Sequence, residues 1–328
     1  MHQRREHEPT VAELGEHEIL KRLRQFCTDD VGDDGAVRSL PAGAQLVVTT
    51  DVLVDGVHFS DRTLPPEALG WRAAAVNLSD LAAMGATPMG LTIGLTLPPA
   101  TPWVWVESLY QGFTDCLHQY GGAIIGGDLC RGSHRSLAIT ALGCVRQALY
   151  RHRAQANQTL VATGVHGASR AGLALLLDEL NAPESFAQTW IRAHQYPIPR
   201  FEAIALLQNF DRIAGMDTSD GLADAVIQIC RQSQIGARLL RSQLPVPPGL
   251  IETVGQSTAE QWTLYGGEDF ELVLSLPPDI ANGVVSALPS SQIIGYTTPE
   301  TEIRLVDDMA NGADIQLDQN QGFQHFSS

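Results

Sequence analysis

Hydrophobic and polar positions alternate at helical and strand spacing along the whole chain. A helix over residues 11–26 is predicted by the apolar positions Val11, Leu14, Ile19, Leu23 and Phe26, which are separated by charged side chains. The β-branched run "AQLVVTTDVLV" at 44–54 predicts a strand. An alanine-rich segment that opens with two prolines and ends at Gly85 predicts the next helix.

The same alternation continues in two series. The first series contains a strand at 90–98, a helix at 103–119 and strands at 122–128 and 136–145. The second series predicts strands at 159–164, 236–240 and 270–277, helices near 168–180, 184–193, 200–209 and 278–287, and a helix that begins within "AGMDTSDGLADAV" (214–226). Both halves are therefore expected to be α/β or α+β. The polar segment "RHRAQANQ" suggests a boundary, which gives domains at 1–150 and 151–328.

The amino-acid composition weighs against several classes of function. The 328 residues are 44% hydrophobic and 18% charged, as in globular proteins, and the formal net charge of −16 weighs against a nucleic-acid partner. Lys21 is the single lysine, and it lies in a helical pattern without a glycine loop, so kinases that need a P-loop or strand lysine are improbable. If the protein binds phosphate groups, arginines, backbone amides and metal ions must supply the positive charge.

The cysteines and the hydropathy pattern suggest a location. Five cysteines are scattered without a CxxC pair, which favours free thiols in a reducing compartment. The charged segment "MHQRREHEPT" lacks the apolar centre of a signal peptide, and no apolar run has the length of a membrane span. We expect a cytosolic protein without a membrane partner.

Acidic residues and glycines gather at six places where a strand is expected to end or a helix to begin. They are "VGDDGA" (33–34), "TTD" (49–51), "NLSD" (Asp80), "IIGGD" (126–128), "MDTSD" (217–220) and "YGGED" (266–269). Ligands of α/β folds bind at such positions. Taken singly, each place also has an ordinary interpretation, such as a helix cap, a turn or a solvated face.

Taken together, the six places favour a metal-dependent phosphate site. "LVVTTDVLV" sets Asp51 among β-branched residues, where an unpaired carboxylate is costly to bury. Arginines are too few to pair with every aspartate, and oxygen ligands without His or Cys suit Mg²⁺. Asp217 and Asp220 are about one helical turn apart and can face one cleft, with Ser219 free to bond phosphate. We favour a solvated position for the neighbouring Asp224.

The motifs "GDDGAV", "TTDVLVDGVHF", "AVNLSDLAAMGATP", "IIGGDLCRG", "MDTSDGLADAV" and "YGGEDFELV" follow one another in the order and spacing of the thiamine-monophosphate kinase family. The chain resembles this family from about residue 14 to "GFQHF". The family is related to aminoimidazole ribonucleotide synthetase and selenophosphate synthetase. The resemblance implies ATP-dependent phosphorylation of thiamine monophosphate (TMP) to thiamine diphosphate. It also implies a two-domain α/β fold of the aminoimidazole ribonucleotide synthetase type and a homodimer that pairs the N-terminal sheets.

The resemblance also implies site residues. The implied magnesium ligands are Asp34, Thr49, Thr50, Asp51, Asp80, Asp128, Asp217 and Asp220. The implied ATP contacts are Tyr110, Gly127, Asp128, Arg151 and Ser219, and the implied substrate contacts are His58, Glu268 and Phe323. Two alternatives stay open: Asp33 in place of Asp34, and Arg153 in place of Arg151, since "LYRHRAQANQ" departs from the family's spacing.

Two other activities compete. A selenophosphate synthetase would carry a reactive cysteine and a lysine in a glycine-rich N-terminal segment, and Cys27 in "RQFCTDD" has neither feature. A catalytically inactive protein of the same fold that only binds metal or nucleotide is disfavoured, because every aspartate position of the family motifs is occupied by aspartate. Because the acceptor phosphate is already ionised at neutral pH, we expect no catalytic general base.

Overall fold

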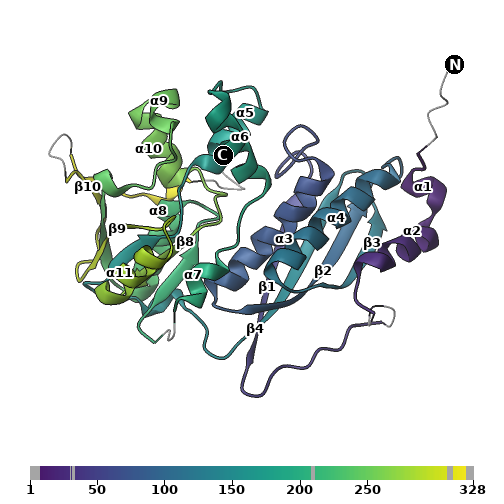
Figure 1. Ribbon diagram of the computed structural model, residues 1–328, viewed down its shortest axis with the longest axis horizontal. Coiled ribbons are helices and arrows are strands. Elements are labelled where there is room, and N and C mark those ends of the chain that lie inside the picture. The colour runs from purple at the N-terminus through teal and green to yellow at the C-terminus, as the bar shows by residue number, and fades with distance from the viewer. Residues whose placement is uncertain (1–7, 30, 32–33, 208–210, 309–312, 323–328) are drawn as a thin grey trace. The chain divides into compact units, whose positions relative to one another are not determined.

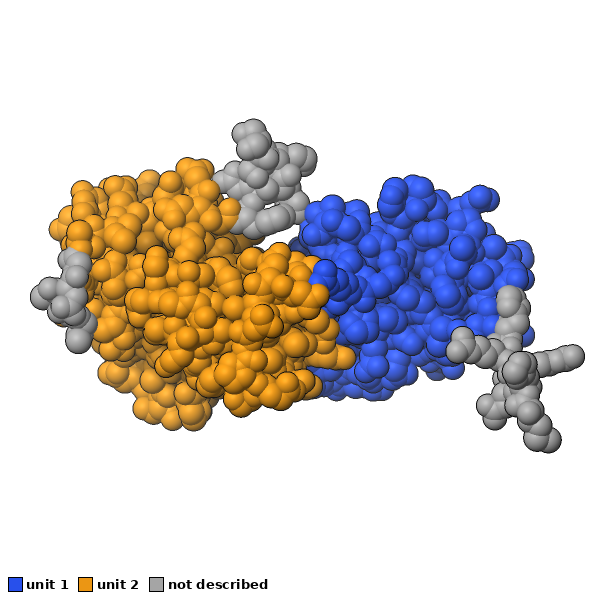
Figure 2. Space-filling model, turned by 90° about the horizontal axis from the view of Figure 1, so that it is seen from above, with its two compact units in different colours: residues 1–81, 87–144 blue, residues 82–86, 145–328 orange. Residues whose placement is uncertain are grey.

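The computed structural model describes residues 8–29, 31, 34–207, 211–308 and 313–322. The chain divides into two compact units, which Figure 2 colours separately. Unit 1 comprises residues 1–81 and 87–144, and unit 2 comprises residues 82–86 and 145–328. The described residues form a mixed α/β structure with two sheets, so the predicted fold class is confirmed.

Unit 1 is a four-stranded sheet with helices. Its elements are α1 (Val11–Leu14), α2 (Glu16–Leu23), η1 (Arg24–Phe26), β1 (Gln45–Val54), α3 (Pro66–Ala83), β2 (Thr87–Leu97), α4 (Trp103–Tyr120), β3 (Ile124–Arg131) and β4 (Ser136–Val145). The strand order is β1-β4-β2-β3, so β1 and β3 are the two edges. The predicted helix over 11–26 is interrupted at Gly15, whose φ of 74° is left-handed.

Helices α3 and α4 run side by side on one face of this sheet (Figure 1). They cross closely at Gly70 and Gly112, because a Cβ at either position would meet the backbone of the other helix. Along the strands of this sheet, buried side chains on the helix side alternate with exposed side chains on the other side. On β4, Leu137 and Ile139 are buried against the helices, whereas Ala138 between them is exposed. On β1, Leu46, Val48 and Val52 are about half exposed on the face away from α3.

Unit 2 is a seven-stranded sheet with helices on both faces. Its elements are η2 (Arg151–Arg153), β5 (Thr159–Ala162), α5 (Ala168–Leu176), α6 (Glu184–Gln195), α7 (Phe201–Ala205), β6 (Ala214–Asp217), α8 (Leu222–Ser233), β7 (Gly236–Leu240), η3 (Arg241–Gln243), α9 (Leu250–Val254), α10 (Gln256–Tyr265), β8 (Leu272–Leu276), α11 (Pro278–Ala287), β9 (Gln292–Thr298), β10 (Ile303–Val306), β11 (Ile315–Gln316) and η4 (Gln319–Gln321). The strand order is β11-β10-β7-β9-β5-β8-β6.

Strand β8 shows how completely this sheet is covered. All five of its residues are buried. Val273 packs in a cluster with α8, whereas Leu272 and Leu274 pack on the other face with α7 and α11. A third cluster joins α5, α6, α9 and α10 around Trp190. Among the described residues, no helix has the length and apolar character that crossing a membrane requires.

Candidate active site

In unit 1, two of the predicted metal ligands are in direct contact. Thr49 on β1 donates a hydrogen bond from its hydroxyl to Oδ2 of Asp80, near the end of α3. Thr49 and Asp51 are two residues apart on a strand, so they share the half-buried face that carries α3. The structure therefore brings together Thr49 and Asp80 on the same face as Asp51.

The other predicted residues of this sheet lie elsewhere. Thr50 is exposed on the opposite face, where its hydroxyl is 2.9 Å from that of Thr140, so its side chain points away from that of Asp51. Gly127 and Asp128 are exposed on β3, at the far edge from β1. Three strand spacings separate the edges, or about 14 Å. The sheet of one chain thus keeps Asp128 apart from Asp51.

Three further predictions fall on unit 1. Asp34 is exposed in a bend, and Asp33 lies outside the described residues. His58 follows β1, and its Nδ1 accepts a hydrogen bond of 3.1 Å from the backbone N–H of Val54. Tyr110 is only 5% exposed on α4, where its ring contacts those of Phe26 and Phe113 and burial raises its pKa. Little of its surface is open to a nucleotide.

In unit 2, three loops lie next to one another at the same end of strands β5, β8 and β6. Strand β8 pairs antiparallel with both β5 and β6, so the segment before β8 lies beside the segments that follow β5 and β6. These loops are 163–167, 218–221 and 266–271. The motifs "MDTSDG" and "YGGEDFE" are therefore neighbours in space although about 50 residues separate them in sequence.

The loop after β6 carries three predicted site residues. Asp217 ends β6 and is buried, and its Oδ1 accepts a hydrogen bond of 3.1 Å from the Ser219 hydroxyl. Asp220 is exposed, and Gly221, with a φ of 110°, precedes the first turn of α8. A Cβ at Gly221 would meet the backbone oxygen of Leu264 at 2.9 Å. The Ser219 side chain thus stands at the positive end of α8, a favourable place for an anion.

The loop before β8 (residues 266–271), which we call the Glu268 loop, adopts an uncommon backbone conformation. Gly267, Glu268 and Phe270 have φ values of 66°, 60° and 53°, which are left-handed. The N–H of Glu268 donates a 2.7 Å hydrogen bond to the carbonyl oxygen of Ser219. A predicted substrate contact and a predicted ATP contact are therefore joined through their backbones. Phe323, the other predicted substrate contact, lies outside the described residues.

The prediction for Asp224 is wrong. This residue is 7% exposed in the first turn of α8, not solvated. Burial raises its pKa and the charge of Asp220 adds to that effect, while hydrogen bonds to Gln319 and Gln228 and the charge of Arg151 act in the opposite direction. The helix turns Asp224 inward because α8 packs this side against η2 and η4.

The two candidate arginines of η2 have different surroundings. The charge of Arg151 acts on Asp224, at the start of α8. Arg153 lies over the ring of Tyr150 at 4.8 Å and 3.9 Å from Asp211. Arg153 is thus already engaged by two side chains, which favours Arg151 as the arginine that serves the α8 end of the site.

Sequence reasoning missed the residues that support these loops. Glu271 is buried and accepts hydrogen bonds from Arg200 at 2.5 and 2.6 Å and from the Thr163 hydroxyl at 2.6 Å. Its backbone carbonyl accepts the N–H of Thr218 at 2.9 Å. A Cβ at Gly164 would collide with the Glu271 carboxylate, so only glycine fits there. The charged pair Arg200–Glu271 was hidden in the sequence because 71 residues separate its members.

Asp269 is a second acid of the Glu268 loop, and it is partly buried. Its two carboxylate oxygens accept hydrogen bonds from the N–H groups of Gly167 (2.7 Å) and Ser169 (2.9 Å), at the start of α5. Burial raises the pKa of Asp269 to about 7, against the lowering effect of these two hydrogen bonds. Its motif "GGED" was noticed in the sequence, but nothing there identified the partner helix.

The donor set fits a hard divalent cation. Thr49, Asp51 and Asp80 in unit 1 offer only oxygen atoms, as do Asp217, Ser219 and Asp220 in unit 2, and oxygen donors are what Mg²⁺ prefers. Within the part of the chain that the structure describes, no group of three or more His, Cys, Asp or Glu side chains forms a ready metal cage.

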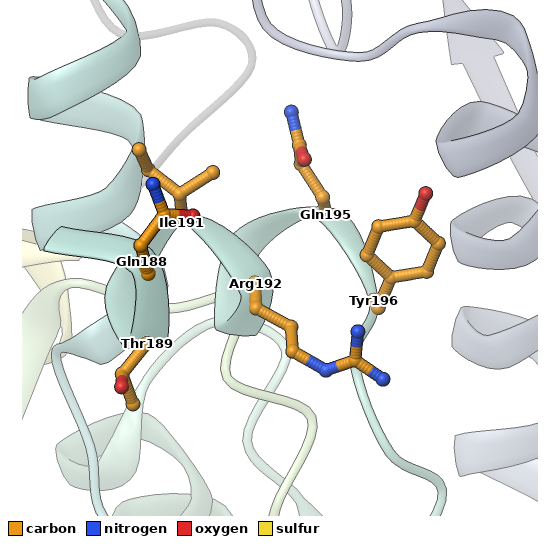
Figure 3. A pocket seen from close by; sticks show the side chains of 6 residues that line it. All are labelled: Gln188, Thr189, Ile191, Arg192, Gln195 and Tyr196. Carbon is orange, nitrogen blue, oxygen red and sulfur yellow. The ribbon is translucent and has the colours of Figure 1, made fainter.

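An open pocket lies on α6 of unit 2 (Figure 3). It is lined by Gln188, Thr189, Ile191, Arg192, Gln195 and Tyr196. None of the predicted site residues lines it. The opposite side of the same helix carries the buried Trp190 and His194.

Comparison with known proteins gives consistent matches. The family described as AIR synthase related protein, N-terminal domain, matches residues 32–145. A thiamine-monophosphate kinase of Synechococcus elongatus is 47% identical over 331 residues, covering 97% of this chain and 98% of the relative. The crystal structure of thiamine-monophosphate kinase from Stenotrophomonas maltophilia superposes with a TM-score of 0.76 at 33% identity, covering 88% of this chain and 94% of that one. The structure of AaThiL complexed with AMPPCP and TMP gives a TM-score of 0.75 at 29% identity, with 93% and 97% covered.

Proposed function

The chain belongs to the thiamine-monophosphate kinase family, and from this premise we propose that it phosphorylates TMP with ATP to give thiamine diphosphate and ADP. The family relatives carry this activity in their name, and one related structure holds an ATP analogue together with TMP. The resemblance expected from the sequence motifs is confirmed by these matches.

One observation of the structure carries the proposal furthest. The hydrogen bond from Glu268 to Ser219 joins the loop assigned to the substrate with the loop assigned to ATP. A phosphoryl donor and its acceptor must come within about 3–3.5 Å of each other, so their binding loops must be neighbours. The antiparallel pairing of β6 and β8 supports this arrangement.

The proposal includes the site residues. ATP is assigned to Tyr110, Gly127, Asp128, Arg151 and Ser219, and TMP to His58, Glu268 and Phe323. Magnesium is assigned to Asp34, Thr49, Thr50, Asp51, Asp80, Asp128, Asp217 and Asp220. The contact between Thr49 and Asp80 and that between Asp217 and Ser219 support the assignment most directly. The burial of Tyr110 and the outward side chain of Thr50 support it least.

The chemistry requires little from protein bases. An oxygen of the TMP phosphate forms a bond to the terminal phosphorus of ATP while the bond from that phosphorus to the bridging oxygen breaks, and ADP leaves. The second pKa of a phosphate monoester is about 6, so this nucleophile is already ionised at neutral pH. The obstacle is repulsion between two anions. Arg151 and the amino end of α8 would lower this repulsion, and bound Mg²⁺ would neutralise further phosphate charge.

A homodimer is also part of the proposal. The face of the unit 1 sheet away from α3 and α4 exposes Leu46, Val48 and Val52, which is unusual for the surface of a monomer. A second copy packed there would cover these residues. We further propose a cytosolic location, because all five cysteines are free thiols.

A coupled assay with ATP, Mg²⁺ and TMP tests the activity. We expect ADP release that depends on TMP, with thiamine diphosphate as the second product. The same assay with thiamine in place of TMP is the control, because the unphosphorylated alcohol lacks the ionised acceptor. Absence of ADP above the background without TMP would contradict the proposal.

The dependence of kcat on pH tests the absence of a general base. At saturating TMP we expect kcat to stay nearly constant between about pH 7 and 9, because the acceptor is ionised throughout. Because TMP is saturating, kcat does not report changes in the affinity for TMP, including any that arise from the titration of Asp269. A steep rise of kcat with an apparent pKa above 7 would instead indicate a protein base.

A further inference from the structure

Glu268 is held from two sides by a closed ring of contacts. Its Oε2 is 3.9 Å from Nδ1 of His194 on α6, and the same nitrogen is 3.1 Å from the Ser169 hydroxyl on α5. The N–H of Ser169 donates to Asp269, the residue next to Glu268 in the chain. The ring thus runs from Glu268 through His194, Ser169 and Asp269 back to Glu268.

The members of this ring differ in their exposure to solvent, and this difference indicates their roles. The Glu268 side chain is 38% exposed, whereas that of His194 is 2% exposed and Ser169 is fully buried. Ser, His and Asp are also the residues of nucleophilic triads. Here, however, Asp269 accepts from backbone N–H groups and the Ser169 hydroxyl has no access to solvent, so a nucleophilic role is excluded. His194 and Ser169 are too deeply buried to touch a ligand, whereas the Glu268 side chain can.

The backbone of the Glu268 loop explains why such support is needed. Left-handed φ values at Glu268 and Phe270 cost on the order of 1 kcal/mol each or more, and they persist only where the surroundings enforce them. On one side of Phe270, Asp269 is fixed to the start of α5. On the other side, Glu271 is fixed by Arg200. These two anchors leave the loop little freedom to relax.

We propose that His194, Ser169 and Asp269 are positioning residues that hold the Glu268 carboxylate in place and thereby set the affinity for the organic cation of the substrate. The inference rests on the proposed function, in which Glu268 contacts TMP. Asp269 fixes the backbone of Glu268, and His194, held by Ser169, fixes its side chain. The three residues act through Glu268 and not on the transferred phosphate.

The first test separates KM from kcat. His194→Leu removes the imidazole nitrogen that faces Glu268 and leaves an apolar side chain, and Ser169→Ala removes the hydroxyl that orients His194. For each variant we expect KM for TMP to rise about fivefold, the scale of a partly exposed electrostatic contact, with kcat changed less than about twofold. His118→Leu, at an exposed histidine on α4, is the matched control and should change neither. An unchanged KM for TMP in His194→Leu would overturn the proposal.

The second test asks whether His194 acts through Glu268. In a Glu268→Gln background, His194→Leu should raise KM for TMP by less than about twofold, because the group that it positions is already altered. A general loss of packing would instead add its full effect in both backgrounds. Full additivity therefore contradicts the positioning role even if each single variant weakens TMP binding.

Hydrogen exchange distinguishes failure of this inference from failure of the proposed function. In Asp269→Asn, the amides of Gly167 and Ser169 should exchange at least about tenfold faster than in the unaltered protein, since one carboxylate acceptor is replaced by an amide nitrogen. Asp279→Asn, an exposed residue in the first turn of α11, is the control. If the unaltered protein turns over no TMP, the proposed function fails. If exchange at Gly167 and Ser169 is unchanged, the anchor itself fails.

Discussion

The sheets of the two units differ in what covers them. Strand β1 of unit 1 alternates, with half-buried Thr49 and Asp51 on the helix side and exposed Val48 and Val52 on the other. Strand β8 of unit 2 is buried on both faces. Thr49 and Asp51 of unit 1 therefore project from a regular strand, whereas Ser219, Asp220 and Glu268 of unit 2 lie on loops held by charged side chains. In unit 1 the pleat of strand β1 determines where these side chains point. In unit 2 the Arg200–Glu271 pair and Asp269 hold the loops that carry them.

The largest effect is expected from a ligand on the regular strand. Asp51→Asn removes a charge but keeps shape, so kcat should fall by about two orders of magnitude or more while the melting temperature is little changed. Steady-state kinetics and thermal unfolding measure both quantities. Asp115→Asn, on the exposed side of α4 where it pairs with Gln111, is the control. Near-normal turnover in Asp51→Asn would contradict metal binding at this position.

The buried pair that supports the loops should dominate stability. Arg200→Met leaves the Glu271 carboxylate buried without its cation, which should lower the free energy of unfolding by about 3–5 kcal/mol. Arg304→Met removes one of the two arginines that contact the exposed Glu302 and should cost about 1 kcal/mol or less. Urea unfolding compares the two variants. Equal losses would mean that the loops of unit 2 do not depend on this pair.

The uncovered face of the unit 1 sheet predicts association. Val48→Lys places a charge at the centre of the proposed dimer contact and should shift the protein from dimer to monomer at micromolar concentration. Val37→Lys changes an exposed valine outside the sheet and should leave the assembly unaltered. Light scattering after size exclusion gives the mass of each variant. A dimer that persists unchanged in Val48→Lys would place the contact elsewhere.

The smallest effect concerns a buried histidine of unit 2. Burial lowers the pKa of His166 to about 3, and its Nε2 is buried without a hydrogen-bond partner among the described residues. The unfolded chain, with a histidine pKa near 6.5, binds this proton first, so the free energy of unfolding should fall as pH drops below about 6.5. Asp269, whose pKa is raised, works in the opposite direction and remains in both proteins compared below.

His166→Asn removes the titrating group but keeps a donor for the Gly164 carbonyl. Between about pH 6 and 4, its free energy of unfolding should fall less steeply than that of the unaltered protein, by up to about 1.4 kcal/mol per pH unit. Urea unfolding at several pH values gives both slopes. Parallel slopes would show that His166 takes up its proton in the folded state.

Periodicity was a good guide to regular elements and a poor one to loops. The strand expected at 44–54 is β1 (Gln45–Val54), and the helix expected at 103–119 is α4 (Trp103–Tyr120). Helices α9 and α10 were missed because Gly255, with a φ of 81°, divides one apolar pattern into two short pieces. Asp224 was placed in solvent because the sequence does not show that η2 and η4 pack on its side of α8.

The site was predictable as a set of motifs but not as a geometry. Local patterns identified "MDTSDG" and "YGGED", and strand pairing then made them neighbours. The left-handed conformations of Glu268 and Phe270 had no local signal, because residues other than glycine take them only under tertiary constraint. The position of Asp128 depends on the order of the strands, which no single strand sequence reveals.

The peptide hydrogen bond between Ser219 and Glu268 has a thermodynamic consequence for the two substrates. A nucleotide that orders Ser219 also restrains Glu268, so a smaller loss of conformational entropy remains when TMP arrives. Linkage requires that each ligand then raise the affinity of the other by the same factor. The two substrates are thus expected to bind with mutual cooperativity through a single main-chain bond.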